Sequence, residues 1–137
     1  MKLQFLIFAC IIFKFSTAIL QNVTVRGVTF CNKKPVAKVD VRLVEKDIVG
    51  QYDTLNRVRT NEMGEFEVFG EKNEYFSITP ILQIIHRCNT EINCLRTSTY
   101  VIPEKFVGSV YDMNLIALDL YDNDETYCHN LLSPWAQ

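Results

Sequence analysis

Five cysteines carry the clearest covalent chemistry in this chain. Cys10 lies inside an apolar N-terminal run, whereas Cys31, Cys88, Cys94 and Cys128 are spread over the rest of the sequence. Four cysteines predict a pair of disulfides, for which three connectivities exist. We predict that Cys31 pairs with Cys128 and that Cys88 pairs with Cys94, because a short polar loop can bring the second pair together.

Two histidines lie beside cysteines, in His86-Arg87-Cys88 and in Cys128-His129, which raises a metal site as the alternative to disulfides. The spacings match no zinc pattern such as paired Cys-x-x-Cys motifs, so we predict no metal. His86 is expected to be a structural residue on an apolar strand, and His129 to be solvated. Because neither histidine has a nearby nucleophile, we predict no catalytic residues and no cofactor.

An acidic cluster follows the last predicted strand and consists of Asp119, Asp122, Asn123, Asp124 and Glu125. Carboxylate and amide oxygens suit calcium, but the cluster lacks the spacing of an EF-hand loop. We therefore expect a solvated acidic loop from Asp119 to Glu125.

Two further features could mark a modification or a contact. Asn22-Val23-Thr24 is the single glycosylation sequon, which predicts Asn22 as a glycan acceptor. Most aromatic residues are expected to fill a core. Tyr75 and Phe76 lie in a predicted loop and are better candidates for a surface contact.

The N-terminus has the three parts of a secretory signal peptide. Lys2 is a positive n-region, Leu3 to Phe13 is an apolar run, and Ser16-Thr17-Ala18 supplies small residues, so cleavage is predicted after Ala18. A membrane anchor is disfavoured, because Lys14 interrupts a run shorter than the ~20 residues of a spanning helix. The mature protein is therefore expected to be secreted, with no transmembrane segment.

Removal of residues 1–18 leaves 12 of the 14 basic residues against 16 acidic ones, a formal charge of −4. An acidic chain without a basic stripe argues against nucleic acid as a partner. This length supports one core, so residues 19–130 are expected to form one domain and residues 131–137 a tail.

The remaining chain has the pattern of short strands separated by turns. Val39, Val41 and Leu43 alternate with polar residues, as in a half-buried strand, and Leu82, Ile84 and His86 share one face of another. Strands are predicted at 23–30, 37–44, 57–60, 81–88, 97–102 and 111–120 and from Phe66 onward, with a turn at 32–35 and loops at 47–56 and 71–79. This pattern predicts an all-β, antiparallel β-sandwich of about seven to eight strands with at most one short helix.

Five segments recur in one order in a known family: Gln21 to Gly27, Cys31-Asn32-Lys33-Lys34-Pro35, Thr60-Asn61-x-x-Gly64-x-Phe66, Ile85-His86-Arg87-Cys88 and Tyr111-Asp112. The ordered set resembles the nematode transthyretin-like family over nearly the whole mature chain. The chain departs from the family where Lys34 precedes Pro35, in a turn that often contains glycine.

The resemblance implies an extracellular transthyretin-like sandwich without known enzymatic activity. One family member recognises phosphatidylserine on dying cells, but no binding motif for that role is matched here. The hydrolases of 5-hydroxyisourate in the wider superfamily use two histidines, an arginine and a C-terminal Tyr-Arg-Gly-Ser. Here the first strand has no histidine and the sequence ends Pro134-Trp135-Ala136-Gln137, so that set is absent.

The leading hypothesis is a secreted, non-enzymatic binding module, linked to a cell surface or lipid. Its unknown partner would be an extracellular protein, a lipid or a small hydrophobic ligand. The alternative is an extracellular carrier of a small hydrophobic ligand, which requires an apolar cavity of at least ~300 Å³. A hydrolase ranks third, because it requires polar groups that converge in a cleft.

Overall fold

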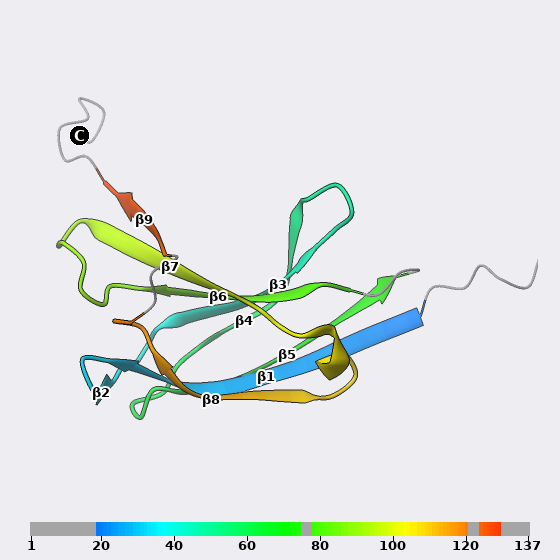
Figure 1. The fold of residues 1–137 in the computed structure, drawn as a ribbon, viewed down its shortest axis with the longest axis horizontal. Coiled ribbons are helices and arrows are strands. Elements are labelled where there is room, and N and C mark those ends of the chain that lie inside the picture. The colour runs from blue at the N-terminus through cyan, green and yellow to red at the C-terminus, as the bar shows by residue number, and fades with distance from the viewer. Residues whose placement is uncertain (1–18, 75–77, 121–123, 130–137) are drawn as a thin grey trace, which may run out of the picture.

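The computed structural model describes residues 19–74, 78–120 and 124–129. Within these residues, nine strands and one short 3-10 helix form two sheets (Figure 1). The elements are β1 (Ile19–Cys31), β2 (Lys34–Pro35), β3 (Asp40–Lys46), β4 (Tyr52–Arg59), β5 (Glu65–Glu74), β6 (Pro80–His86), β7 (Cys94–Val101), η1 (Glu104–Phe106), β8 (Val110–Ala117) and β9 (Glu125–Cys128). The predicted signal peptide, the predicted tail, Tyr75, Phe76, Asp122 and Asn123 lie outside the described residues.

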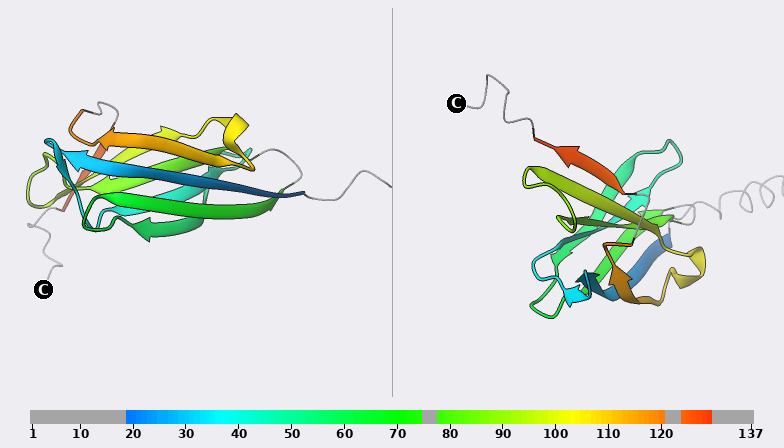
Figure 2. Two further views of the ribbon diagram at one scale, coloured as in Figure 1. Left: turned by 90° about the horizontal axis from the view of Figure 1, so that it is seen from below. Right: turned by 60° about the vertical axis from the view of Figure 1, so that its left-hand side comes forward.

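The two sheets are packed as separate layers (Figure 2). In the first sheet, β1 pairs antiparallel with β2 and β5 and parallel with β8. In the second sheet the order is β4-β3-β6-β7-β9, and every neighbouring pair is antiparallel. The predicted all-β sandwich is confirmed, and the parallel pair is the one departure from antiparallel pairing among the described strands.

The strand boundaries differ from the prediction at two loops. β4 begins at Tyr52, inside the segment predicted as a loop from 47 to 56. This strand forms one edge of its sheet and is mostly exposed, so its sequence lacks the alternation that marks a half-buried strand. β5 continues to Glu74, because its polar end pairs with the first four residues of β1.

The core lies between the sheets and follows the predicted alternation. Fully buried residues on β1, β3, β5 and β6 face one another across the layers, and Ile116 and Leu118 close the core from β8 and the residues after it. The buried aliphatic residues of the four strands include Val23, Val25, Val41, Leu43, Val68, Leu82 and Ile84. Each contributes roughly 1.5–3 kcal/mol through removal of apolar surface from water.

A buried threonine cluster, Thr29 and Thr60, stabilises the end of the sandwich where the chain passes from β4 to β5. The Thr29 and Thr60 hydroxyls lie 3.1 and 2.7 Å from the carbonyl oxygen of Val36, and the Thr60 hydroxyl also accepts the Val39 amide. The Thr29 amide donates to the Gly64 carbonyl oxygen over 2.8 Å. Both threonines are buried, so these contacts pair backbone groups to which water has little access.

Left-handed backbone occurs at non-glycine residues in one turn and in one bulge of the first sheet. Asn32 and Lys33 connect β1 to β2 with φ of 50° and 66°, which confirms the predicted turn. On β8, Asn114 has φ of 57° and its amide donates to the Asp112 carboxylate over 2.9 Å. The register between β1 and β8 shifts at this bulge. In the described part of the chain, no helix is long and apolar enough to cross a bilayer.

Gly64 offers a test of the packing around Thr29 and Thr60. It has φ of +76°, and an added Cβ would lie 2.5 Å from the Thr29 carbonyl oxygen. Gly108 is the matched control: its φ is +82°, but nothing lies within 4 Å of an added Cβ. We expect Gly108→Ala to cost about 1–2 kcal/mol from the left-handed backbone alone. Gly64→Ala should lower the free energy of unfolding, measured with denaturant, by at least about 1 kcal/mol more than Gly108→Ala does. Equal losses would show that the close packing at Gly64 is unimportant.

Candidate functional site

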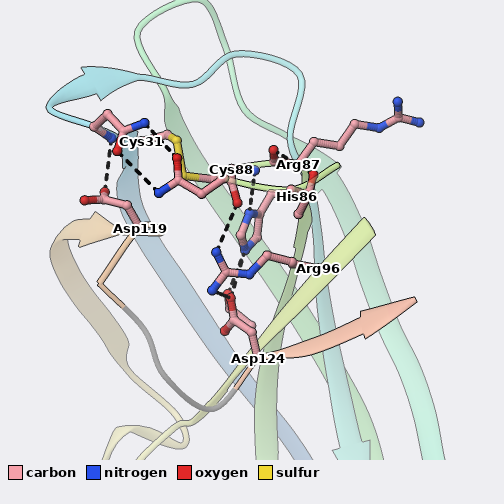
Figure 3. Close-up of a disulfide and its surroundings, with 11 residues drawn as sticks. Cys31, His86, Arg87, Cys88, Arg96, Asp119 and Asp124 are labelled. Carbon is pink, nitrogen blue, oxygen red and sulfur yellow. Dashed lines mark hydrogen bonds and ion pairs between the residues drawn. A yellow bond between two sulfur atoms is a disulfide. The ribbon is translucent and has the colours of Figure 1, made fainter. Parts of the chain in front are cut away.

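The four mature-chain cysteines form two disulfides, but not with the predicted partners. Cys31 is bonded to Cys88, and Cys94 to Cys128. The predicted pairs Cys31–Cys128 and Cys88–Cys94 were therefore wrong. The first observed bond joins β1 in one sheet to the residues after β6 in the other (Figure 3).

The pairing follows from the path of the C-terminal segment. After β8 the chain returns to the second sheet as β9, where Cys128 lies directly opposite Cys94 on β7. Cys88 is buried with the core and faces β1 instead of closing the loop to Cys94. β9 has no alternating apolar pattern, because all four of its residues are exposed.

A buried polar cluster lies near the Cys31–Cys88 disulfide (Figure 3). His86 is 3% exposed, and its Nε2 lies 2.8 Å from Ser98 Oγ on β7 and 3.4 Å from Asp124 Oδ2. Arg96 Nη2 lies 2.6 Å from the same carboxylate oxygen, and Arg96 Nη1 donates to the Cys88 carbonyl oxygen. These contacts fix Asp124, the residue that precedes β9, against the second sheet.

Serine, histidine and aspartate together suggest a hydrolytic triad, but the geometry is different. The Cys88 amide donates to His86 Nδ1 over 3.1 Å, so Nδ1 carries no proton and Nε2 carries it. A catalytic triad needs a free Nε2 facing the serine and an acid at Nδ1. Here Ser98 and Asp124 both face Nε2, and Ser98 is fully buried. The cluster therefore cannot activate Ser98 as a nucleophile.

Burial sets the protonation of His86. Desolvation lowers the pKa of the imidazole, the Asp124 carboxylate opposes this shift, and the positive charge of Arg96 adds to it. The neutral imidazole agrees with the hydrogen bond that Nδ1 accepts. The prediction of His86 as a structural residue agrees with this geometry.

The acidic cluster is not the uniform solvated loop that was expected. Asp119 accepts the Asn32 amide over 3.1 Å, at the turn that follows Cys31. The Asp124 side chain is 2% exposed and ion-paired with Arg96. Glu125 is exposed on β9. Among the described residues no group of three or more ligating side chains could hold a metal ion.

A polar hollow of about 540 Å³ opens beside the Arg96–Asp124 pair, and Glu91 and the Cys94–Cys128 disulfide also line it. The neighbouring His129 is exposed, and its amide donates to the Asn93 carbonyl oxygen. Sequence reasoning missed this hollow, because β9 was not predicted and the walls come from two segments, 89–96 and 124–128, that lie far apart in the sequence.

The predicted glycan acceptor lies within a strand. Asn22 is half-buried on β1, between two residues that pair with β5, and its carbonyl oxygen accepts the Gly108 amide. Because Val23 and Val25 face the core, the alternation of the strand directs Asn22 to the outer face of the sheet. Glycosylation of Asn22 stays a prediction.

An exposed apolar tip was also missed by the sequence reasoning. Ile48 and Val49 are 91% and 75% exposed, at the end of the hairpin between β3 and β4 that projects from the sandwich in Figure 1. Asp47 orders the tip, because its carboxylate accepts the amides of Val49 and Gln51 over 3.0 and 2.8 Å. Gly50 completes the turn with φ of +85°.

Two facing sheets, an inter-sheet disulfide and a second disulfide at a sheet edge define a disulfide-linked β-sandwich domain. A model of the transthyretin-like family matches residues 26–103. Transthyretin-like protein 16 of Caenorhabditis elegans is 48% identical over 105 residues, which cover 76% of this chain and 80% of the relative. Transthyretin-like protein 5 of the same organism is 35% identical over 72% of this chain and 76% of its own length. The chain belongs to the transthyretin-like family.

The solved structures add no functional information. A 9R-lipoxygenase from Cyanothece aligns with 74% of this chain and 17% of its own, at 17% identity and a TM-score of 0.49. No enzymatic activity is named in the curated relatives reported above.

The lowered pKa of His86 predicts a pH-dependent stability. Below about pH 6.5 the unfolded chain binds a proton that folded His86 resists, so acidification should destabilise the fold. The slope can reach about 1.4 kcal/mol per pH unit for one proton. We expect denaturant unfolding between pH 7 and pH 5.5 to show this slope in the wild type and to lose it in His86→Gln. His129→Gln is the control and should keep it; a wild-type slope in His86→Gln would contradict the assignment.

Proposed function

We propose that this protein is a secreted binding module without enzymatic activity, and that it attaches to lipid surfaces through the Ile48–Val49 tip. The observation that carries the proposal is a pair of aliphatic side chains held almost fully in solvent on an ordered hairpin. Single exposed aliphatic residues are ordinary, but Ile48 and Val49 are adjacent on one tip, and contiguous exposed apolar groups mark contact surfaces.

Secretion is supported by the signal-like N-terminus and by the two disulfides, which persist in oxidising compartments. Cleavage after Ala18 would keep all of the described β1, from Ile19 onward. The non-enzymatic role is supported by the His86 geometry, because the one described serine–histidine–aspartate cluster has its proton on the wrong nitrogen.

The tip suits insertion into the interfacial region of a bilayer. Backbone amides that enter an apolar phase need internal partners, and those of Val49, Gly50 and Gln51 have them in Asp47. The side chains of Ile48 and Val49 can then enter lipid without leaving these amides unpaired. Burial of both would supply a few kcal/mol of favourable transfer free energy, at roughly 1.5–3 kcal/mol each.

Charges around the tip indicate which lipids it would bind. Lys46 is followed by Asp47, and Asp53 lies opposite Glu45 on the β4 strand. The Lys46 ammonium lies 5.8 Å from the Tyr52 ring centroid. No excess of basic residues surrounds the tip, so attraction to anionic lipid should be weak.

The proposal is tested by cosedimentation with vesicles of phosphatidylcholine, with and without phosphatidylserine. We expect binding to both, with little difference between them. The double substitution Ile48→Ser, Val49→Ser should weaken it at least about tenfold, equivalent to a loss of 1.4 kcal/mol. Thermal unfolding should be unchanged, because neither side chain is buried.

Ile92→Ser is the matched control, because Ile92 is 85% exposed but lies in the loop before β7. It should leave vesicle binding unchanged. Equal loss in both variants, or absence of vesicle binding by the wild type, would refute the lipid proposal. Binding to cells but not to vesicles would point instead to an extracellular protein as the partner.

A second candidate function is transport of a small hydrophobic ligand. An apolar hollow of about 310 Å³ lies at the open side of the sandwich, lined by Tyr100 on β7 and by Met113, Leu115, Ile116, Ala117 and Leu120. This volume is at the lower end for small-molecule sites. The carrier function ranks second because Leu115 and Leu120 are exposed, so the hollow would enclose a ligand poorly.

The carrier function predicts that an apolar fluorescent probe such as anilinonaphthalene sulfonate binds in this hollow. Leu115→Asp should then reduce probe binding at least about tenfold, because it places a charge in an apolar wall. Val101→Asp is the control, since Val101 is exposed on β7 and does not line the hollow. Equal probe binding by both variants and the wild type would exclude the hollow as a carrier site.

A further inference from the structure

We infer that the Cys94–Cys128 disulfide is a thiol-exchange site, and that a thiol that cleaves it releases β9 from the edge of β7. The two disulfides of the chain differ in their surroundings, and this difference carries the inference. Cys88 is buried and packs in the core, with Cys31 against it. In the second bond Cys94 is also buried, at 5% exposed, but Cys128 is exposed on the edge strand β9, whereas Cys31 is only partly exposed.

The Cys94–Cys128 disulfide can be reached through the polar hollow, which is lined by both of its cysteines. The hollow measures about 540 Å³, a volume that accommodates a small polar ligand. Arg96, Thr126 and Glu91 supply polar walls, so the entering molecule would be a hydrophilic thiol and not an apolar one. The Cys31–Cys88 bond has no such approach among the described hollows.

The exchange step is a substitution at sulfur. A thiolate attacks Sγ of Cys128, the residue that is exposed on β9, the Cys94–Cys128 bond breaks, and Cys94 leaves as a thiolate. The product is a mixed disulfide between the entering thiol and Cys128. A second thiolate resolves it, so that two thiols are oxidised to one disulfide while Cys94 and Cys128 are reduced.

Little else holds β9 in place once the bond is cut. Its four residues are all exposed, so it buries no side chain in the core. Its ladder to β7 contains four residue pairs, and the His129 amide adds one bond to Asn93. Asp124 remains fixed by Arg96 at the start of the strand, so the released segment would begin at Glu125.

Release would change the surface that the sandwich offers. With β9 in place, β7 is paired on both sides; without it, Cys94–Thr97 becomes an unpaired edge. An unpaired edge of this kind accepts extended segments through backbone hydrogen bonds. Reduction would therefore convert a covered edge into an open one without disturbing the two-sheet core.

The test follows both disulfides of the folded, secreted protein during timed reduction. Peptide mapping after alkylation should first recover Cys31–Cys88 and Cys94–Cys128 in the untreated protein. With reduced glutathione, we expect Cys94 and Cys128 to be alkylated at least about tenfold faster than Cys31 and Cys88, because reactivity follows access. In denaturant the two rates should converge, which shows that the fold causes the difference.

A parallel reduction with thioredoxin shows whether a small thiol or a dithiol protein cleaves the Cys94–Cys128 bond faster. Faster cleavage by glutathione at equal thiol concentration supports a small thiol that enters the hollow, and faster cleavage by thioredoxin supports a dithiol protein. Hydrogen exchange should then rise at Cys94–Thr97 and β9 but not in β3 or β6. The variant Cys94→Ser, Cys128→Ser should show the same exchange pattern without a reductant.

Three results would overturn the inference: reduction of both disulfides at one rate in the folded protein, earlier reduction of Cys31–Cys88, or unchanged exchange at β7 after cleavage. The variant Cys31→Ser, Cys88→Ser is the matched control and should keep the exchange of β9 low. If this variant fails to fold, the rate comparison in the wild-type protein still decides the question.

Discussion

The carbonyl oxygen of Val36 accepts hydrogen bonds from two buried threonine hydroxyls. These bonds hold the two sheets together at this end of the sandwich. Thr29 belongs to the first sheet and Thr60 follows the last strand of the β3–β4 hairpin in the second. The chain must cross between the layers here, and the crossing leaves backbone groups that neither sheet pairs. A buried backbone group left unpaired would cost about 1–3 kcal/mol of stability, and the two hydroxyls avoid this cost. Gly64 can approach Thr29 closely because it has no side chain.

Buried polar groups near the Cys31–Cys88 disulfide are also paired, but by different residue types. Where β6 ends beside β7, His86 is paired with Ser98, and the Asp124 carboxylate is in ion-pair contact with Arg96 and His86. Such a cluster resembles a catalytic one in its composition. The position of a single backbone amide, that of Cys88, decides the proton on the imidazole and makes the arrangement structural. The chemistry of these residues thus depends on the local backbone more than on residue type.

Much of the fold could be predicted from the sequence, because period-two alternation is visible wherever one face of a strand is buried. Val41, Leu43, Leu82 and Ile84 showed this pattern and lie in the core. β4 and β9 bury little and left no such pattern. The disulfide pairing failed for the same reason, since the position of Cys128 depends on β9. The hollow and the buried Asp124 also depend on that strand, so neither could be found from local sequence.

The bulge at Asn114 has a consequence for behaviour at high concentration. β8 lies at an edge and carries exposed Val110 and Leu115, features that favour sheet growth by addition of further chains. The left-handed Asn114 and its bond to Asp112 interrupt the regular spacing that an incoming strand would need. The Asn114 amide and Arg26 lower the pKa of Asp112, so the carboxylate stays charged in mild acid. The negative charge that accompanies the bulge at this edge should therefore persist in mild acid.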